Sequence, residues 1–478
     1  MTERLEAVIG LEIHVQLATK TKMFCGCELS FGDEPNVHTC PICLAHPGVL
    51  PVTNEQAIGY ALQIAAALEC EVAPRSIFHR KNYFYPDSPK AYQISQYDIP
   101  LASNGKLGEV RIHRAHLEED AAKMIHVGES GRIHGSGASL VDFNRGGTPL
   151  VEIVTEPDLR SAARAAEWAR LLRETVRQLG VSDVNMEEGS LRVDANVSVR
   201  PAGSDQLGTK TELKNMNSFR FLQRGVEAEI ERQRELIAAG GTVTQETLHF
   251  DPVSGSLTSL RSKEEAHDYR YFPEPDLVPL APTEEMLREA REALPELPAA
   301  RIERYVEMGL AEDVAKLLAS DPETAEFFEK VNDGMSDVAP QTVANWITGD
   351  LAAALRQLNK SRGERPRLAE DLVSIMSMVS TKQISHQSGR ETLFSVVEDD
   401  KLTPKQHVEE RGLAQISDGG ELEAIVAAAV VANPEAAEQI RAGNDKAIGA
   451  IVGAVMKETK GRADGGEVNR LIREKLDL

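Results

Sequence analysis

The sequence lacks any long hydrophobic run, and no apolar stretch approaches the roughly 18 residues that a membrane-spanning helix needs. Its opening residues, MTERLEAVIG, have neither the apolar core of a signal peptide nor the Arg- and Ser-rich composition of a transit peptide. Two glycine-rich phosphate loops are also missing, G-x-x-x-x-G-K-[ST] and G-x-G-x-x-G after a strand. We therefore expect a cytoplasmic protein without a membrane partner, and any use of ATP must rely on carboxylates and a divalent metal ion.

Positive charge is scarce, since the net charge is −22 over 478 residues. This balance argues against a general polyanion-binding protein, so any contact with nucleic acid must be local or made through a partner. One local candidate lies between Lys457 and Lys475, where six basic residues face four acidic ones. An ordinary surface helix of mixed charge explains the same segment equally well.

Cysteine is rare but clustered, because four of the five cysteines lie within nineteen residues. They form the pattern C-x-C, twelve residues, C-x-x-C, and comprise Cys25, Cys27, Cys40 and Cys43. In a chain without export signals, two close thiol pairs predict a structural zinc site rather than disulfides. Unligated reduced thiols are the alternative.

Several candidate strands carry carboxylates on a polar face. Residues 8–17, VIGLEIHVQL, alternate apolar and polar side chains, which places Glu12 and His14 on one face. Glu152 stands alone in an apolar strand-like run, where a carboxylate is costly unless it is paired or bound to metal. With Glu118 and Glu212 these side chains form a set of mostly anionic oxygen ligands that suits Mg²⁺. A solvated sheet face is the alternative for the first strand.

The organisation of the chain predicts an α+β protein of several domains, since single cores rarely exceed roughly 300 residues. The first 290 residues interleave strands with amphipathic helices, for example a predicted helix over 161–179. Six prolines between 273 and 298 mark a boundary, and nearly everything beyond it has helical periodicity. We expect domains at 1–294, 295–402 and 403–478, with the second joint near the KLTPK segment.

Several motifs then carry a resemblance to a known family. The segments are GLEIHVQL, RKNYFYPDSPKAYQISQYD, HLEEDA, NRGGTPLVEIVTEPD, MEEGSLRVDANVSVR, TELKNMNSF, DYRYFPEPDL and, near the C-terminus, MKETKGRAD…VNRLI. In this order, over nearly the whole chain, they resemble the B subunits of the bacterial tRNA-dependent amidotransferases. That family converts Glu-tRNA(Gln) to Gln-tRNA(Gln), or Asp-tRNA(Asn) to Asn-tRNA(Asn).

The resemblance implies an N-terminal cradle domain with a curved antiparallel sheet, similar to glutamine synthetase and guanido kinases, followed by two all-helical domains that bind tRNA. It implies that ATP and Mg²⁺ serve to phosphorylate the side-chain carboxylate of the tRNA-bound amino acid, and that ammonia then displaces the phosphate. The chain has no amidase-type serine loop and no glutaminase-like cysteine. The ammonia is therefore expected from an amidase (A) subunit, with a small C subunit completing a heterotrimer.

The resemblance also implies roles for individual residues. It places the Mg²⁺ ligands at Glu12, His14, Glu118 and Glu152. Glu119 is implied in gating ammonia, and Lys81 and Lys90 in lining its route. We add Glu212 as a catalytic candidate and Asp194, Asn196 and Lys214 as ATP-binding candidates, because these residues lie on the polar faces of their predicted strands.

Two other functions are compatible with parts of the sequence. A non-catalytic, zinc-dependent tRNA-binding subunit explains the cysteines and the basic tail but not Glu12, His14 or Glu152. A metallohydrolase explains the histidines and carboxylates, but the histidines outside the first strand lack H-x-x-x-H spacing. Whether Glu-tRNA, Asp-tRNA or both are substrates stays open.

Overall fold

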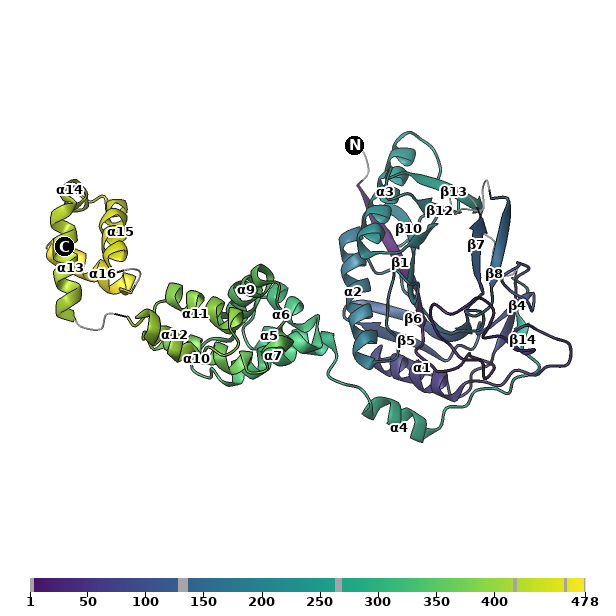
Figure 1. The fold of residues 1–478 in the computed structure, drawn as a ribbon. Coiled ribbons are helices and arrows are strands. Elements are labelled where there is room, and N and C mark those ends of the chain that lie inside the picture. The colour runs from purple at the N-terminus through teal and green to yellow at the C-terminus, as the bar shows by residue number, and fades with distance from the viewer. Residues whose placement is uncertain (1–3, 128–135, 263–268, 416–418, 460–461, 477) are drawn as a thin grey trace. The chain divides into compact units, whose positions relative to one another are not determined.

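The computed structural model describes residues 4–127, 136–262, 269–415, 419–459, 462–476 and 478 (Figure 1). The chain divides into two compact units, Met1–Ala300 and Arg301–Leu478. The first unit contains the sheets and the second is helical, so the predicted α+β class is confirmed. The three-domain division at 294 and 402 stays a prediction. Within the described ranges, no helix has the length and apolar character needed to cross a membrane.

A nine-stranded sheet forms the centre of the first unit, in the order β13-β12-β11-β10-β1-β9-β6-β5-β2. Its strands are β1 (Leu5–Gln16), β2 (Glu71–Val72), β5 (Ala102–Leu107), β6 (Val110–Glu119), β9 (Pro149–Thr155), β10 (Leu191–Pro201), β11 (Thr211–Met216), β12 (Glu246–Phe250) and β13 (Leu257–Ser262). The N-terminal strand β1 thus lies between β9 and β10.

The sheet is antiparallel, as expected, with one exception. Strands β11 and β12 pair in parallel, because the helix α3 (Phe219–Ala238) connects them and returns the chain to the same end of the sheet. The fully antiparallel sheet that we expected is therefore wrong at this one pair.

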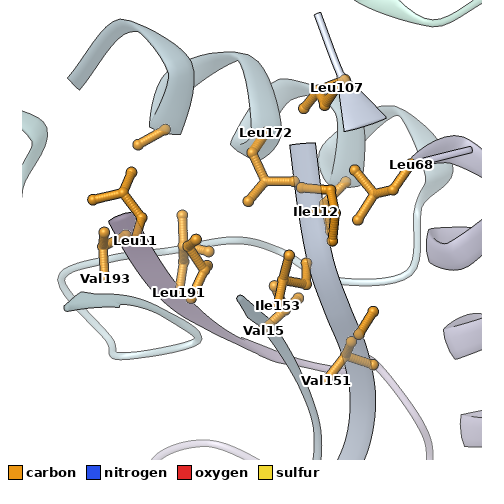
Figure 2. Packing of buried hydrophobic residues seen from close by; sticks show 14 of the residues in the cluster. Leu11, Val15, Leu68, Leu107, Ile112, Val151, Ile153, Leu172, Leu191 and Val193 are labelled. Atoms are coloured by element: carbon orange, nitrogen blue, oxygen red, sulfur yellow. The ribbon is translucent and has the colours of Figure 1, made fainter. Parts of the chain in front are cut away.

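One face of the sheet is apolar and covered by helices (Figure 1). Alternate residues of β1 form the centre of this core, and Leu11 and Val15 are at most 1% exposed. Figure 2 shows how side chains of β1, β6, β9 and β10 meet Leu172 of α2 (Ala162–Leu179). The helices α1 (Glu55–Ala67) and α3 complete the cover.

The helix α2 illustrates how local sequence sets the ends of these elements. Ser161 caps its N-terminus by accepting a hydrogen bond from the backbone N–H of Arg164, and Gly180 ends it with φ of 68°. The helix predicted over 161–179 is thereby confirmed, and its apolar stripe carries Trp168 and Leu172 into the core.

Smaller elements complete the first unit. The strands β3 (His79–Asn82), β4 (Tyr92–Ser95) and β14 (Phe272–Pro273) form a three-stranded sheet, and β7 (Lys123–Val127) pairs with β8 (Ala138–Asp142). In the proline-rich stretch, α4 (Glu284–Glu292) inserts Ala290 into the core of this unit.

The helical unit contains two separate hydrophobic clusters. Helices α5 (Pro298–Glu307), α6 (Glu312–Ala319), α7 (Pro322–Asp333), α8 (Pro340–Asn345), η2 (Trp346–Leu351, a π-helical turn), α9 (Ala352–Leu358), η3 (Arg362–Glu364), α10 (Leu368–Ser380), α11 (His386–Glu398) and α12 (Pro404–Arg411) surround the first cluster. Helices α13 (Gly419–Ala432), α14 (Pro434–Arg441), η4 (Asp445–Ala447), α15 (Ile448–Glu458) and α16 (Gly465–Lys475) surround the second.

Candidate active site

The register of the sheet aligns four polar residues across neighbouring strands. His14 of β1 lies opposite Glu152 of β9 on one side and Arg192 of β10 on the other. Glu152 in turn lies opposite His116 of β6. Because directly opposite residues project to the same face of a sheet, these four side chains form one row on the face away from the helices.

Glu152 is the centre of this row. Its Oε2 lies 3.4 Å from Nε2 of His14 and 3.6 Å from Nε2 of His116. Its Oε1 accepts a hydrogen bond of 3.2 Å from Nη2 of Arg114. Glu152 is only 5% exposed, and a carboxylate in such a place was expected to be either paired or bound to metal. In the structure it is paired with these three side chains.

Glu118 extends the row toward the strand end. Its Oε1 lies 3.5 Å from Nε2 of His14, and its Oε2 accepts a hydrogen bond of 3.2 Å from the hydroxyl of Ser95. Donor atoms of His116, Glu118 and Glu152 all lie within 4.8 Å of one another, as do those of Glu12, His14 and Glu152. Two possible metal-ligand sets therefore share Glu152.

A third set lies further along the sheet. Glu12, Asp194 and Glu212 also place one oxygen each within 4.8 Å of one another. Nζ of Lys214 lies 3.4 Å from Asp194 Oδ2 and 3.6 Å from Glu212 Oε1, and the hydroxyl of Thr247 donates a 2.9 Å hydrogen bond to Glu212. Glu12 belongs to two of the three sets, which makes them one continuous group.

Asn196 lies on β10 opposite Glu212. Its Oδ1 is buried and has no hydrogen-bond partner among the described residues. An amide oxygen without a donor beside carboxylates is suited to a cation.

The charges in this group are unbalanced at Glu12. Burial and the nearby charge of Glu152 raise the pKa of Glu12 to about 7. Burial disfavours the protonated form of His14, but the hydrogen bond to Glu152 and the negative charges of Glu152 and Glu118 together outweigh it and raise the pKa of His14 to about 9. The side chains around Glu12 thus do not neutralise the negative charge at this position. A bound divalent cation would neutralise it.

A cavity of about 520 Å³ opens onto this face. Three cationic side chains line it, from Lys81, Arg192 and Lys214, together with the carboxylates of Glu118 and Asp194. Burial opposes the charge on Lys81, but Glu118, with smaller contributions from Tyr271 and Glu152, outweighs it and raises the pKa of Lys81 above the ordinary value. Cations beside a carboxylate cluster can hold a phosphate-bearing ligand together with its metal ion.

Lys90 and Glu119 lie elsewhere, although Glu119 follows Glu118 directly. Lys90 forms an ion pair with Glu119, and Oε1 of Glu119 also accepts a 2.9 Å hydrogen bond from the backbone N–H of Ile94. Both residues line a second cavity of about 230 Å³, whereas Lys81 lines the first. The two lysines that the resemblance groups together therefore occupy different cavities.

A third cavity of about 20 Å³ shares lining residues with both of these cavities. It has Asp120 and Gln93 in common with the first cavity, and Lys90 and Glu119 in common with the second. The Lys90–Glu119 pair thus lines the second and third cavities but not the first.

The four cysteines converge as the spacing predicts. Their sulfur atoms all lie within 4.8 Å of one another, and Sγ of Cys27 is 4.0 Å from Sγ of Cys43. Tetrahedral zinc with bonds of about 2.3 Å separates its sulfur ligands by about 3.8 Å. All four cysteines are free of disulfides, so the donors fit a zinc ion.

Four site residues were missed by the sequence reasoning. His116, Arg114, Asp120 and Arg192 all contact the predicted carboxylates or each other. Asp120 accepts from Nη2 of Arg192 at 3.0 Å and from the amide of Gln16 at 2.9 Å. The signal was the alternation of Arg114, His116 and Glu118 along one strand, because residues two apart project to the same face.

The basic segment near the C-terminus is largely paired with acidic side chains. Arg470 pairs with Glu467 and Glu474, and Arg473 with Asp445. Lys460, which was counted in this segment, lies outside the described residues. The pairing favours the interpretation as a surface helix of mixed charge.

Taken together, the features define a multidomain protein with a carboxylate and histidine ligand site on a β-sheet, followed by a helical unit. Residues 7–288 match the family described as the GatB/GatE catalytic domain, and residues 326–476 match the GatB domain. The chain belongs to this family, and the resemblance inferred from its motifs is confirmed.

Curated relatives match along their whole length. The chain is 49% identical to the B subunit of the aspartyl/glutamyl-tRNA(Asn/Gln) amidotransferase of Brevibacillus brevis, covering 99% of both chains. It is 48% identical to the proteins of the same name from Persephonella marina and Geobacter sulfurreducens, covering 98% of this chain and 99% of each relative.

Proposed function

We propose that this chain is the B subunit of a glutamine-hydrolysing aspartyl/glutamyl-tRNA(Asn/Gln) amidotransferase, a carbon–nitrogen ligase of the cytoplasm. It transfers ammonia to the side chain of a glutamate or aspartate that is attached to the wrong tRNA. The observation that carries the proposal is the group of three overlapping ligand sets around Glu152 and Glu12. The names of the full-length relatives support the reaction.

The carboxylate site suits the first half of this reaction. A carboxylate resists attack by ammonia, so phosphorylation must first provide a leaving group. Magnesium, when bound, neutralises phosphate charge and orients the transferred phosphoryl group. Glu12, His14, Glu118 and Glu152 would hold it, while Glu212 supports the adjoining ligand set. Lys214, together with Asp194 and Asn196, would bind the phosphates and metal of ATP.

The second cavity suits the delivery of ammonia. Lys90 and Glu119 line this cavity and the small third cavity, which shares Gln93 and Asp120 with the carboxylate site, and Lys81 lines the carboxylate site itself. We assign Glu119 to gating ammonia and Lys81 and Lys90 to its route. The donor would be an amidase (A) subunit, with a small C subunit in the same heterotrimer and the misacylated tRNA bound by the helical unit.

The four-cysteine site has a different role. Four thiolates fill the coordination sphere of zinc and leave no position for a substrate. We therefore assign Cys25, Cys27, Cys40 and Cys43 to a structural zinc ion that fixes the segment around the second cavity.

The non-catalytic alternative is not favoured. Burying a carboxylate costs free energy, and this site contains several buried carboxylates in overlapping ligand sets. A subunit that only binds tRNA and catalyses no reaction would not need them. A metallohydrolase does not account for the relatives named as amidotransferase subunits.

The test is amidation by the reconstituted A, B and C subunits. With ATP, Mg²⁺ and ammonium chloride in place of glutamine, Glu-tRNA(Gln) or Asp-tRNA(Asn) should be converted to its amide, with one ADP per product. Omitting ATP should abolish the product. The proposal is wrong if neither tRNA is amidated under these conditions, and comparing the two tRNAs identifies the substrate.

A further inference from the structure

Lys22 is a buried lysine that the proposed reaction does not use. It is 1% exposed and is among the largest fully buried side chains of the described residues. Its Nζ donates a 2.9 Å hydrogen bond to the backbone carbonyl of Phe143 and lies 3.7 Å from Sγ of Cys43. Its backbone N–H donates to the carbonyl of Cys27 at 3.0 Å, so the residue belongs to the turn that presents the first cysteine pair.

A buried ammonium is costly unless a negative charge compensates it. The carbonyl of Phe143 is neutral, so of these two contacts of Nζ only a thiolate at Cys43 supplies charge. A zinc ion with four thiolates carries a net charge of −2, which is itself unfavourable in a buried place. The ammonium therefore offsets part of the charge of the metal–thiolate group, and the N–H···S contact supports a metal ligand from outside the coordination sphere, as is common for metal ligands.

Lys22 also borders the second cavity. It lines that cavity together with Cys43, Lys90 and Glu119. Gly147 lies next to both Lys22 and Glu119: a Cβ added to it would be in ordinary van der Waals contact with Cδ of Lys22, at 3.4 Å, and with Oε2 of Glu119, at 3.9 Å. The carbonyl of the same glycine accepts a 2.8 Å hydrogen bond from Met23. Lys22 thus contacts both Cys43, a proposed zinc ligand, and the segment 143–147, which lies next to Glu119.

From these contacts we infer that Lys22 is a positioning residue that retains the metal of the four-cysteine site and ties it to the segment 143–147. The inference rests on the proposed zinc site. In this inference, the ammonium of Lys22 offsets charge on the metal–thiolate group. The metal in turn stabilises the segment that lines the second cavity.

The first test is the rate of zinc release from the full chain. Lys22→Met keeps the length of the side chain and removes the ammonium, so zinc should pass to a chromogenic chelator at least about tenfold faster than from the unmodified chain. Lys20→Met is the matched control, because Lys20 is exposed two residues away, and it should release zinc at the original rate. An unchanged rate in Lys22→Met would overturn the inference.

A second test needs no variant and therefore does not depend on how Lys22→Met folds. In the zinc-loaded chain, an amine-reactive acetylating reagent should leave Lys22 unmodified and label Lys20, as read by mass spectrometry. After removal of zinc with a chelator, labelling of Lys22 should rise at least to the level of the partly buried lysines. Equal labelling of Lys22 with and without zinc contradicts the inference, whereas a chain that binds no zinc at all contradicts the proposed zinc site instead.

Discussion

Three successive carboxylates at the end of β6 enter three different networks. Glu118 contacts His14 and Ser95, Glu119 pairs with Lys90, and Asp120 pairs with Arg192. Neighbouring side chains of a strand point to opposite faces, which separates Glu119 from Glu118, whereas Asp120 lines the same cavity as Glu118 but has different partners. Substitutions at these positions should consequently have different effects, although the residues are chemically alike.

At the carboxylate site, Glu152→Gln keeps the shape of the side chain and removes its charge. Substituting a residue that only supports a metal ligand commonly lowers affinity or activity by about 10–100-fold. Because Glu152 is proposed as a ligand itself, we expect ATP-dependent activation to fall by more than about 100-fold. The measurement is ADP formation that depends on misacylated tRNA. Glu156→Gln, on an exposed ion pair with His113, is the control and should retain activity. Full activity in Glu152→Gln would refute the assignment of this site.

At the Lys90–Glu119 pair, Glu119→Gln should impair amidation by ammonia without impairing phosphorylation by ATP. The amide still accepts the hydrogen bond from Ile94 but loses the ion pair with Lys90. We expect the amidation rate with ammonium chloride to fall about tenfold or more, the scale of general acid–base and positioning effects, while ADP formation persists. Lys106→Met, which removes an exposed pair with Glu69, serves as the control. Parallel loss of ADP formation and amidation would contradict a role limited to ammonia.

At the level of elements, alternation and capping made much of the first unit predictable. The pattern of β1 and the Ser161 and Gly180 caps of α2 arise from interactions within a few residues, so they can be recognised locally. The pairing of His14 with Glu152 could not be predicted locally, because it depends on the register of two strands that lie about 140 residues apart in the sequence. The parallel β11–β12 pair was missed for another reason: its signal is the helix α3 between the two strands, an order that favours parallel pairing.

The packing of α2 on the sheet can be tested at Leu172, which is 1% exposed beneath β1 and β10 (Figure 2). Leu172→Ala leaves a cavity and should lower the free energy of unfolding of the first unit by about 2–5 kcal/mol. The chain has two tryptophans, so Trp346→Phe leaves Trp168 of α2 as the only tryptophan reporter in a urea titration. In the same background, Val253→Ala, at a 93% exposed site, should change the midpoint little. A stability loss under about 1 kcal/mol at Leu172 would contradict this packing.

For the whole molecule, the two units have separate hydrophobic cores, which allows each to be tested by itself. A chain ending at Ala300 should keep its sheet, its zinc and its carboxylate site. If the helical unit binds tRNA as proposed, the affinity of this shortened chain for tRNA should fall at least about tenfold, a loss of about 1.4 kcal/mol. Fluorescence anisotropy with labelled tRNA measures the change, and undiminished affinity would place the tRNA contacts in the first unit.

The central position of β1 also governs the order in which the molecule can assemble during translation. The strand β1 leaves the ribosome well before its two partners, β9 and β10, which follow about 140 and 190 residues later. At roughly 5–20 residues per second, β1 waits about 10–40 s before both edges are paired. Until then it presents an apolar face and two open edges, so the nascent chain depends on chaperone protection for most of the synthesis of its first unit.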